Sequence, residues 1–298
     1  MRRRWMGQAW EQVVLPARAA RLGAALVFSP ANLAPLAWPR NVLVMHDAAV
    51  LREPEAYSRA YRAWHATAGL ASARRALGVV TVSEFSRREL VSLAGLDPER
   101  LTVIPGGVDA RFTAAAAAEP VAARLGLTRP YVLTIATDDR RKNLEKLGPV
   151  ARALTQAGIE LVWAGDRRPY FAAAAAAAAV RSLGYVRDAD LPGLYAGARA
   201  FVLPSRYEGF GLTCLEAMAC GTPVVAADRA ALPQTCGDAA ILIDPDDPDA
   251  LAGAVLRAAT EPALREGLRA RGLSRAAQFT WERTAASVDA LLMRLAAG

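Results

Sequence analysis

Two glutamates and a glycine turn lie close together in the stretch SRYEGFGLTCLEAMACGTPVV, residues 205–225. Glu208 comes just before the Gly-Phe-Gly turn, and Glu216 lies in the helix-like segment that follows it. An ionised carboxylate only accepts hydrogen bonds, and it can accept from two hydroxyl groups at once. Since sugars and riboses carry hydroxyl groups in pairs, the two acids predict a pocket for a polyol.

The glycine turn itself predicts an anion site. Ser205 ends a strand-like run, and the apolar spacing of residues 212–220 is typical of a helix. The N-terminus of this helix would lie at the mouth of a parallel sheet, where phosphate groups bind. Gly209 and Gly211 leave backbone N–H groups open to a ligand oxygen at about 2.9 Å. A diphosphate between two polyols is a nucleotide sugar. The alternative, in which both acids only complement the helix dipole, is disfavoured by the two glycines and the following Gly-Thr-Pro.

A basic run supplies the counter-charge that a diphosphate needs. The sequence DDRRKN, residues 138–143, follows a strand-like run and opens a predicted helix at the same sheet edge. Arg141 and Lys142 are placed to neutralise phosphate and to stabilise the charge that builds up on a leaving diphosphate. A basic loop is usually solvated surface, but the position of this one favours the site.

The chain contains two histidines, and we expect different roles for them. His46 follows the apolar run NVLVM at the carboxyl edge of the first sheet, where it could bind a sugar hydroxyl or position an acceptor. The alternative for His46 is a structural turn residue beside Asp47. His65 lies in an amphipathic stretch and is predicted to lie on a helix surface.

Short β-branched runs alternate with amphipathic Ala/Leu/Arg-rich stretches, which predicts an α/β fold with parallel sheets covered by helices. The expected strands are 24–29, 41–47, 78–84, 101–107, 130–137, 159–165, 181–186, 199–205, 222–228 and 239–245. We expect a first Rossmann-like domain at residues 1–112, shortened to about four strands, and a second one at 113–280 that binds the nucleotide sugar. A C-terminal helix at 281–298 is expected to pack back on the first domain.

Composition indicates a soluble, globular, cytoplasmic protein. The 298 residues are 53% hydrophobic, and no apolar run approaches the roughly 20 residues of a membrane-spanning helix. The first residues carry positive charge without the apolar segment of a signal peptide. Cys214, Cys220 and Cys236 are predicted to be reduced thiols that fill small spaces. The alanine run at 172–179 predicts a plain surface helix.

Positive charge is concentrated in the first part of the chain. Residues 1–111 hold 15 arginines and no lysine against nine acidic residues. Such a basic domain suggests an anionic partner: a membrane surface, a phosphorylated acceptor or nucleic acid. The alternative is an arginine-rich composition with solvated faces. We expect no nucleic acid, and we expect peripheral contact with the inner membrane face.

These motifs resemble those of the retaining GT-B glycosyltransferases of family 4, also called group 1. PSRYEGFGLTCLEAMACGTPVV is similar to the family's most specific signature, and DRRKNLEKL to its basic motif. The other matching segments, in the order of the family, are VLVMHDAAV, VVTVSEFSRREL, TVIPGGVDARF, LGYV, ALPQTCGDAAILIDP and FTWERTAASV. The resemblance covers about residue 25 to the end and implies two Rossmann-like domains that face each other across a cleft.

The resemblance also implies roles for single residues. Glu208 would contact donor sugar hydroxyls near the reacting carbon, and Glu216 the ribose of the nucleotide. Lys142, with Arg141 behind it, would hold the diphosphate. Backbone N–H groups in the turn would help them, and the residues concerned are Gly209, Phe210, Gly211 and Leu212. The backbone around Val186 would meet the base.

The reaction that the resemblance implies is transfer of a hexose with retention of configuration, without a metal or cofactor. The acceptor would attack on the face that the phosphate leaves, and the phosphate would take its proton. His46 would approach the donor sugar from the acceptor domain. The Arg-Lys-Asn motif at 141–143 makes GDP-mannose a first guess for the donor. The acceptor is expected to be a glycan or a lipid-linked molecule.

Three departures leave another function open. Nothing before Ala24 resembles the family's opening strand and glycine-rich loop, Ala136 replaces an arginine of some members, and Thr213 replaces a common proline. The alternative is therefore a nucleotide-sugar-binding protein without catalysis. A dinucleotide-dependent oxidoreductase is disfavoured because no Gly-x-Gly-x-x-Gly follows an early strand. The acids at 244–249 have the spacing of a metal site but are predicted to cap the next helix.

Overall fold

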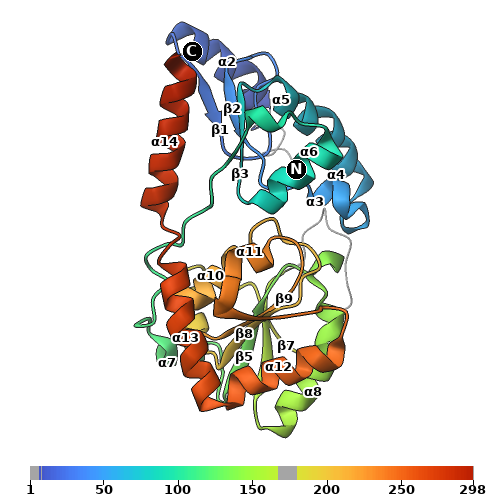
Figure 1. Ribbon diagram of the computed structural model, residues 1–298, viewed down its shortest axis with the longest axis vertical. Coiled ribbons are helices and arrows are strands. Elements are labelled where there is room, and N and C mark those ends of the chain that lie inside the picture. The colour runs from blue at the N-terminus through green and yellow to red at the C-terminus, as the bar shows by residue number, and fades with distance from the viewer. Residues whose placement is uncertain (1–6, 8, 167–179, 298) are drawn as a thin grey trace. The chain divides into compact units, whose positions relative to one another are not determined.

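A computed structural model describes residue 7 and residues 9–166 and 180–297 (Figure 1). The alanine run at 172–179 lies outside the described residues. The chain divides into two compact units. Unit 1 contains the described residues up to Pro105 and from Glu282 onward, and unit 2 contains Gly106–Trp281.

The division between the units differs from the predicted boundaries 1–112, 113–280 and 281–298. The segment after Pro105 groups with unit 2, because the Val108 N–H group donates to the Phe279 carbonyl at 2.9 Å and Phe112 is buried in the unit 2 core. The final helix groups with unit 1 from Glu282 onward.

The described residues of unit 1 form a parallel sheet in the order β1-β2-β3-β4. Its strands are β1 (Val27–Ser29), β2 (Asn41–Val44), β3 (Gly78–Thr81) and β4 (Leu101–Val103). Its helices are η1 (Trp10–Val14), α2 (Leu15–Arg21), α3 (Ala49–Arg52), η2 (Pro54–Ala56), α4 (Arg59–Trp64), η3 (His65–Gly69), α5 (Leu70–Arg75), α6 (Glu84–Ala94), η4 (Pro98–Arg100) and α14 (Trp281–Ala297). The predicted short sheet is therefore confirmed.

Each face of the unit 1 sheet has its own apolar core. On one face, buried residues of α5 and α6 pack against Leu43 and Val79. On the other face, Leu291 of α14 packs with Val42 and Val80. Because successive strand residues point to opposite faces, the continuous apolar runs that the sequence shows here fit a sheet covered on both sides.

The prediction for His65 is wrong. We predicted that it lies on a helix surface, but it is only 3% exposed. It begins η3, a π-helical segment, so the stretch does not keep the 3.6-residue period that the surface prediction assumed. Burial lowers the pKa of His65, and the charge of Asp47 opposes this effect. Among the described residues, its Nδ1 atom has no hydrogen-bond partner.

The described residues of unit 2 form a second parallel sheet, in the order β10-β9-β8-β5-β6-β7. Its strands are β5 (Tyr131–Ile135), β6 (Glu160–Ala164), β7 (Arg181–Gly184), β8 (Ala200–Leu203), β9 (Val224–Ala227) and β10 (Ala240–Ile243). Its helices are α7 (Ala118–Arg124), η5 (Arg140–Lys142), η6 (Leu144–Lys146), α8 (Leu147–Gln156), α9 (Leu191–Ala196), α10 (Leu212–Ala219), α11 (Leu232–Cys236), η7 (Gly237–Ala239), α12 (Pro248–Thr260) and α13 (Pro262–Ala276). Each expected strand of both domains therefore has a counterpart.

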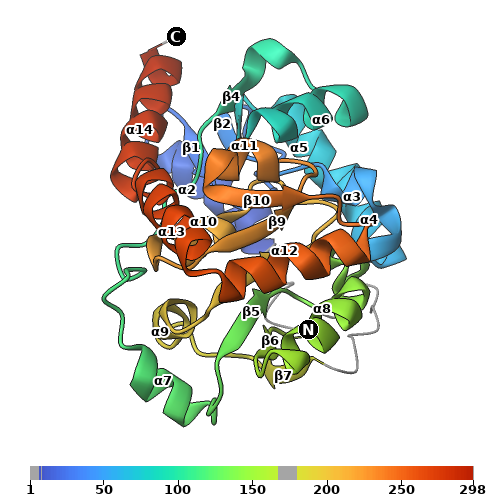
Figure 2. The same cartoon turned by 60° about the horizontal axis from the view of Figure 1, so that its bottom comes forward.

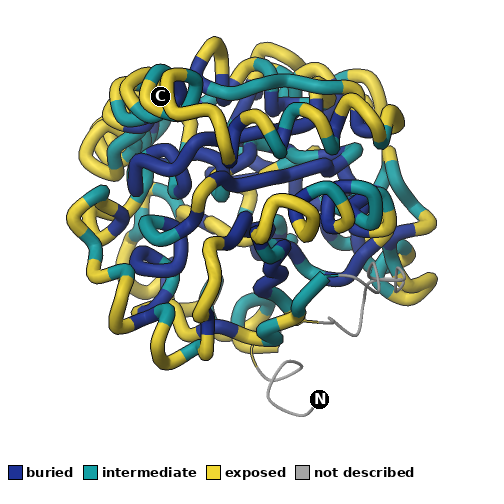
Figure 3. Tube along the Cα trace, turned by 90° about the horizontal axis from the view of Figure 1, so that it is seen from below, coloured by how far each residue is buried: buried dark blue, intermediate teal, exposed yellow. Residues whose placement is uncertain are grey.

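Helices cover both faces of the unit 2 sheet. Helices α8 and α12 lie side by side on one face (Figure 2), where Leu147, Leu154 and Val255 are buried with strand residues. The opposite face packs against α9, α10 and α11. The buried segments run through the interior, and the exposed ones lie on the outer turns of helices and loops (Figure 3). This is a doubly wound Rossmann-like fold.

The strand order places a topological switch point between β5 and β8. From β5 the chain proceeds to β6 on one side, and later it returns to β8 on the other side. The chain therefore leaves these two neighbouring strands toward different parts of the sheet, and the carboxyl ends of such strands are where ligands bind in folds of this class. The loops concerned are residues 136–143 after β5 and residues 204–211 after β8.

The predictions for the cysteines and for the helix cap at 244–249 are confirmed. All three cysteines are buried and free. Asp247 caps α12, since its side chain accepts from the N–H groups of Asp249 and Ala250 at 3.1 and 2.9 Å. Among the described residues, no helix combines the length and apolarity that crossing a membrane requires.

The packing of α14 on unit 1 can be tested with Leu291, which is 5% exposed. Leu291→Ala should lower the free energy of unfolding of unit 1 by about 3 kcal/mol, because it leaves a cavity against the sheet. The measurement is native-state hydrogen exchange at the amides of β2. The control is Met293→Ala on the same helix, whose side chain is 68% exposed; its effect should stay within about 0.5 kcal/mol. Equal effects of the two variants would contradict this packing.

Candidate active site

The switch point of unit 2 brings together two of the predicted site residues. Lys142 comes from the loop after β5, and Glu208 comes from the loop after β8. The Lys142 Nζ and Glu208 Oε1 atoms are 2.6 Å apart. Their side chains are only 13% and 12% exposed. The sequence placed both residues at strand ends, and the strand order makes those ends neighbours.

The loop after β5 is held by the fully buried Asp139. Its carboxylate accepts from Thr137 Oγ1 at 2.8 Å and from the Arg141 N–H group at 3.1 Å, and it lies 3.3 Å from Arg141 Nε. Asn143 then adopts a left-handed backbone with φ of 58°. Its side-chain amide donates to the Pro245 carbonyl at 3.0 Å. These contacts fix the short turn η5 that carries Lys142.

Asn143 also explains a difference from the sequence analysis. We predicted that residues 138–143 open a helix directly. Instead, two 3₁₀ turns, η5 and η6, precede α8, which begins at Leu147. A left-handed residue cannot continue a right-handed helix, so the basic residues lie in a tight turn rather than on a helix face.

The loop after β8 is hydrogen-bonded to the loop after β5 and leads into the N-terminus of α10. The Arg206 N–H group donates to the Arg141 carbonyl at 2.8 Å. Gly211 begins the helix with a left-handed φ of 97°. A Cβ atom there would lie 2.6 Å from Leu232, so only glycine fits. No described side chain caps α10, so the amides of its first turn remain suited to an anion.

Glu208 is a carboxylate held in its charged form. Burial by itself would raise its pKa, but the charges of Lys142 and Arg141 and the hydrogen bond from Lys142 outweigh burial. The pKa of Glu208 is therefore below its usual value, and the group is ionised at neutral pH. The pair is a cation and an anion side by side, both largely shielded from water.

Glu216 has a different partner from Glu208. Its Oε2 atom accepts a hydrogen bond from the Tyr195 hydroxyl at 2.9 Å. Burial raises the pKa of Glu216 to about 7. The Tyr195 hydrogen bond and the charge of Arg111 oppose this rise, whereas Asp188 and Asp109 add to it. The two glutamates therefore have separate protein partners and opposite pKa shifts, and their contact with one ligand stays a prediction.

The other predicted residues of unit 2 lie around the same loops. Gly209 is buried, and the ring of Phe210 packs edge-on against Phe279 with centroids 5.7 Å apart. Leu212, the first residue of α10, is 37% exposed. Val186 is buried shortly after β7.

His46 belongs to unit 1, apart in the chain from the other predicted site residues. It follows β2 and is exposed. Its backbone N–H group donates to Asn32 Oδ1 at 3.0 Å, and its carbonyl accepts from Thr81 Oγ1 at 3.2 Å. These contacts fix the backbone at this strand end and leave the imidazole exposed.

Two further features of the sequence mark this site and were not used in the predictions. The chain contains 34 arginines but only two lysines, Lys142 and Lys146. A lysine at the switch point of such an arginine-rich chain marks a place where a compact ammonium group is needed. The second feature is Tyr195, which lies in an apolar helix, because a buried tyrosine hydroxyl usually has a partner.

Comparison with known proteins identifies the family. Residues 129–261 match the family described as Glycosyl transferases group 1, and residues 8–112 match Glycosyltransferase Family 4. The O-antigen chain mannosyltransferase B of Escherichia coli is 35% identical over 256 residues, which cover 82% of this chain and 67% of that protein. The MMP alpha-(1->4)-mannosyltransferase of Mycolicibacterium hassiacum is 31% identical over 231 residues, or 74% of this chain and 54% of that protein. The chain thus spans roughly half to two thirds of these relatives.

A solved structure shares the fold. Sucrose-phosphate synthase from Thermosynechococcus elongatus superimposes with a TM-score of 0.75 at 25% identity, over 95% of this chain and 76% of that one. With the sequence matches to both halves of the chain, this fold agrees with the predicted GT-B class. The chain belongs to the group 1 glycosyltransferases of family 4, which are hexosyltransferases.

Proposed function

We propose that this protein transfers a mannosyl group from a nucleotide sugar to a glycan or lipid-linked acceptor, with retention of configuration. The observation that carries the proposal is the buried pair of Lys142 and Glu208, 2.6 Å apart at the switch point of unit 2.

The closeness of this pair suits a sugar joined to a phosphate. In a nucleotide sugar the anomeric carbon is one bond from an oxygen of the diphosphate. A site that binds both groups needs a cation for the phosphate and an acceptor for the neighbouring hydroxyl groups, side by side. Lys142 would supply the cation and Glu208 the acceptor.

The site would assist the reaction by stabilising charge. When the bond between the anomeric carbon and the phosphate oxygen breaks, negative charge builds up on the diphosphate. Lys142, Arg141 and the amides at the tip of α10 would stabilise that charge. The acceptor hydroxyl would attack on the face that the diphosphate leaves, and its proton would pass to the leaving phosphate oxygen. His46 of unit 1 would contact the donor sugar.

The relatives favour mannose as the sugar, since both mannosyltransferases reported above match most of this chain. The Arg-Lys-Asn sequence at 141–143 makes GDP-mannose the first donor to test. The arginine excess of residues 1–111 favours an acceptor that carries phosphate, such as a lipid-linked diphosphate at a membrane face.

Turnover should depend on the pair at the switch point. Lys142→Ala and Glu208→Gln should each lower turnover by about a hundredfold or more, because each removes a charge-assisted contact near the reacting bond. The measurement is release of free nucleotide from a panel of nucleotide sugars, with and without acceptor glycans. The matched control is Lys146→Ala, which removes the chain's other lysine four residues away.

The same assay separates the proposed transferase from a binding protein. Saturable binding of a nucleotide sugar by the unaltered protein, without release of nucleotide even with acceptors, would point to the non-catalytic alternative. Unchanged rates in Lys142→Ala and Glu208→Gln would show that the reaction occurs elsewhere.

Donor binding should become tighter as the pH rises through about 7. The ionised form of Glu216 binds a pair of hydroxyl groups more strongly, because both of its oxygens accept charge-assisted hydrogen bonds, and the pKa of Glu216 is about 7. At pH 6 about one tenth of the group is ionised and at pH 8 about nine tenths, so affinity should rise about tenfold between them. The measurement is calorimetry with GDP-mannose, because its diphosphate has no group that titrates in this range. In Glu216→Gln the affinity should be lower and independent of pH over this range; a similar rise in this variant would assign the effect to another group.

A further inference from the structure

We propose that Tyr195 is a positioning residue for the donor: its hydroxyl group fixes the Glu216 carboxylate in the orientation and charge state that bind a ribose diol. This inference rests on the proposed function, in which Glu216 binds the ribose.

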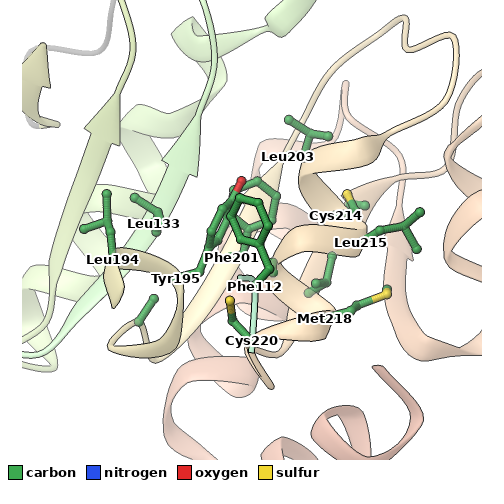
Figure 4. Close-up of a cluster of buried hydrophobic side chains, with 14 of the residues drawn as sticks. Phe112, Leu133, Leu194, Tyr195, Phe201, Leu203, Cys214, Leu215, Met218 and Cys220 are labelled. Atoms are coloured by element: carbon green, nitrogen blue, oxygen red, sulfur yellow. The ribbon is translucent and has the colours of Figure 1, made fainter. Parts of the chain in front are cut away.

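Tyr195 and Glu216 meet at the boundary between the apolar core and the site. Tyr195 lies on α9 and is 0% exposed, whereas Glu216 lies on α10 and is partly exposed. The Tyr195 hydroxyl donates to Glu216 Oε2 at 2.9 Å. In Figure 4 the Tyr195 ring stands among apolar side chains of the core.

The packing around Tyr195 leaves its hydroxyl one position. Its ring meets Phe112 and Phe201 edge-on, with centroids 5.8 and 5.4 Å away (Figure 4). Its backbone carbonyl accepts from Thr222 Oγ1 at 2.7 Å. Because ring and backbone are both held, the hydroxyl is a fixed donor beside the carboxylate.

The chemistry of this hydrogen bond suits a diol site. A carboxylate has about four acceptor positions, and Tyr195 occupies one of them. The remaining positions suffice for the two neighbouring hydroxyl groups of a ribose. Burial raises the pKa of Tyr195 well above its usual value, and the charge of Glu216 adds to this. The tyrosine therefore remains a donor at every pH at which the enzyme would work.

Three charged groups act on Glu216, in addition to the neutral Tyr195 hydroxyl that reaches it from the core. Arg111 and Asp109 belong to the segment that enters unit 2, and Asp188 precedes α9. Arg111 favours the ionised form of Glu216, and the two aspartates oppose it. The thiols of Cys214 and Cys220 lie near Tyr195. A hydrogen bond with Cys236 and then burial raise the pKa of Cys214, and burial raises the pKa of Cys220, so both thiols stay protonated.

The test compares two conservative variants of buried tyrosines. Tyr195→Phe removes the donor to Glu216. Tyr131→Phe is the matched control, since it removes a buried hydroxyl that donates to a backbone carbonyl, that of Leu194 at 2.7 Å, rather than to a carboxylate. Two quantities are measured in each: the titration of Glu216 by carbon NMR of labelled glutamate, assigned with Glu216→Gln, and the affinity for GDP-mannose across pH 5.5 to 9.

In Tyr195→Phe the midpoint of the Glu216 titration should move up by about one pH unit, because the ionised form loses a charge-assisted hydrogen bond. Affinity for GDP-mannose at pH 7 should fall about fivefold or more, and the pH at which affinity rises should move up together with the Glu216 midpoint. Tyr131→Phe should lower thermal stability but change neither the midpoint of the Glu216 titration nor the pH dependence of the affinity for GDP-mannose.

The outcomes separate this inference from the proposed function. An unchanged Glu216 titration in Tyr195→Phe, or the same displacement in both variants, would overturn the positioning role. If the Glu216 titration moves in Tyr195→Phe but the unaltered protein binds no nucleotide sugar, Tyr195 does act on the Glu216 carboxylate, and the proposed function is wrong. A displaced titration with unchanged affinity at every pH would overturn the role of Glu216 in ribose binding.

Discussion

The candidate site depends on the strand order of unit 2. Strand β5 has β6 on one side and β8 on the other, so the loops that follow β5 and β8 leave the sheet from neighbouring strand ends. One loop carries Lys142 and the other Glu208, which lie 66 residues apart in the chain. Their contact at 2.6 Å is therefore a product of topology rather than of local sequence. The hydrogen bond from the Arg206 N–H group to the Arg141 carbonyl fixes the two loops relative to each other.

The protein shifts the pKa values of its two site glutamates in opposite directions. Two cationic side chains keep the buried Glu208 ionised. Burial raises the pKa of Glu216, and the Tyr195 hydroxyl and the charge of Arg111 oppose this rise only in part. Glu216 therefore titrates near neutral pH. Taking a charge out of water is costly, and the cost is met only where the partners are close and well oriented. In the proposed reaction Glu208 must stay charged beside the reacting bond, whereas Glu216 only binds a remote part of the donor.

Much of this could be predicted from the sequence because continuous apolar runs identify buried parallel strands. Every expected strand has a counterpart, and the helix after Gly211 begins at the expected residue. The failures have local causes. His65 is buried at the start of a π-helical segment, whereas the prediction of a surface position assumed a regular α-helix. The run at 138–143 was predicted to open a helix directly, but two 3₁₀ turns precede α8 because Asn143 is left-handed.

Contacts between distant residues could not be predicted in the same way. The sequence indicated that Glu208 and Glu216 flank a turn, but not that one would pair with Lys142 and the other with Tyr195. Side-chain partners depend on strand order, which apolar patterns do not define. The distribution of lysine was a usable signal, since a chain with 34 arginines has both of its lysines beside one strand end. An ammonium group is compact and can approach a phosphate oxygen and a carboxylate together, whereas a guanidinium group is broader and planar. The lysine at position 142 thus fits a site in which phosphate and sugar must be held almost in contact.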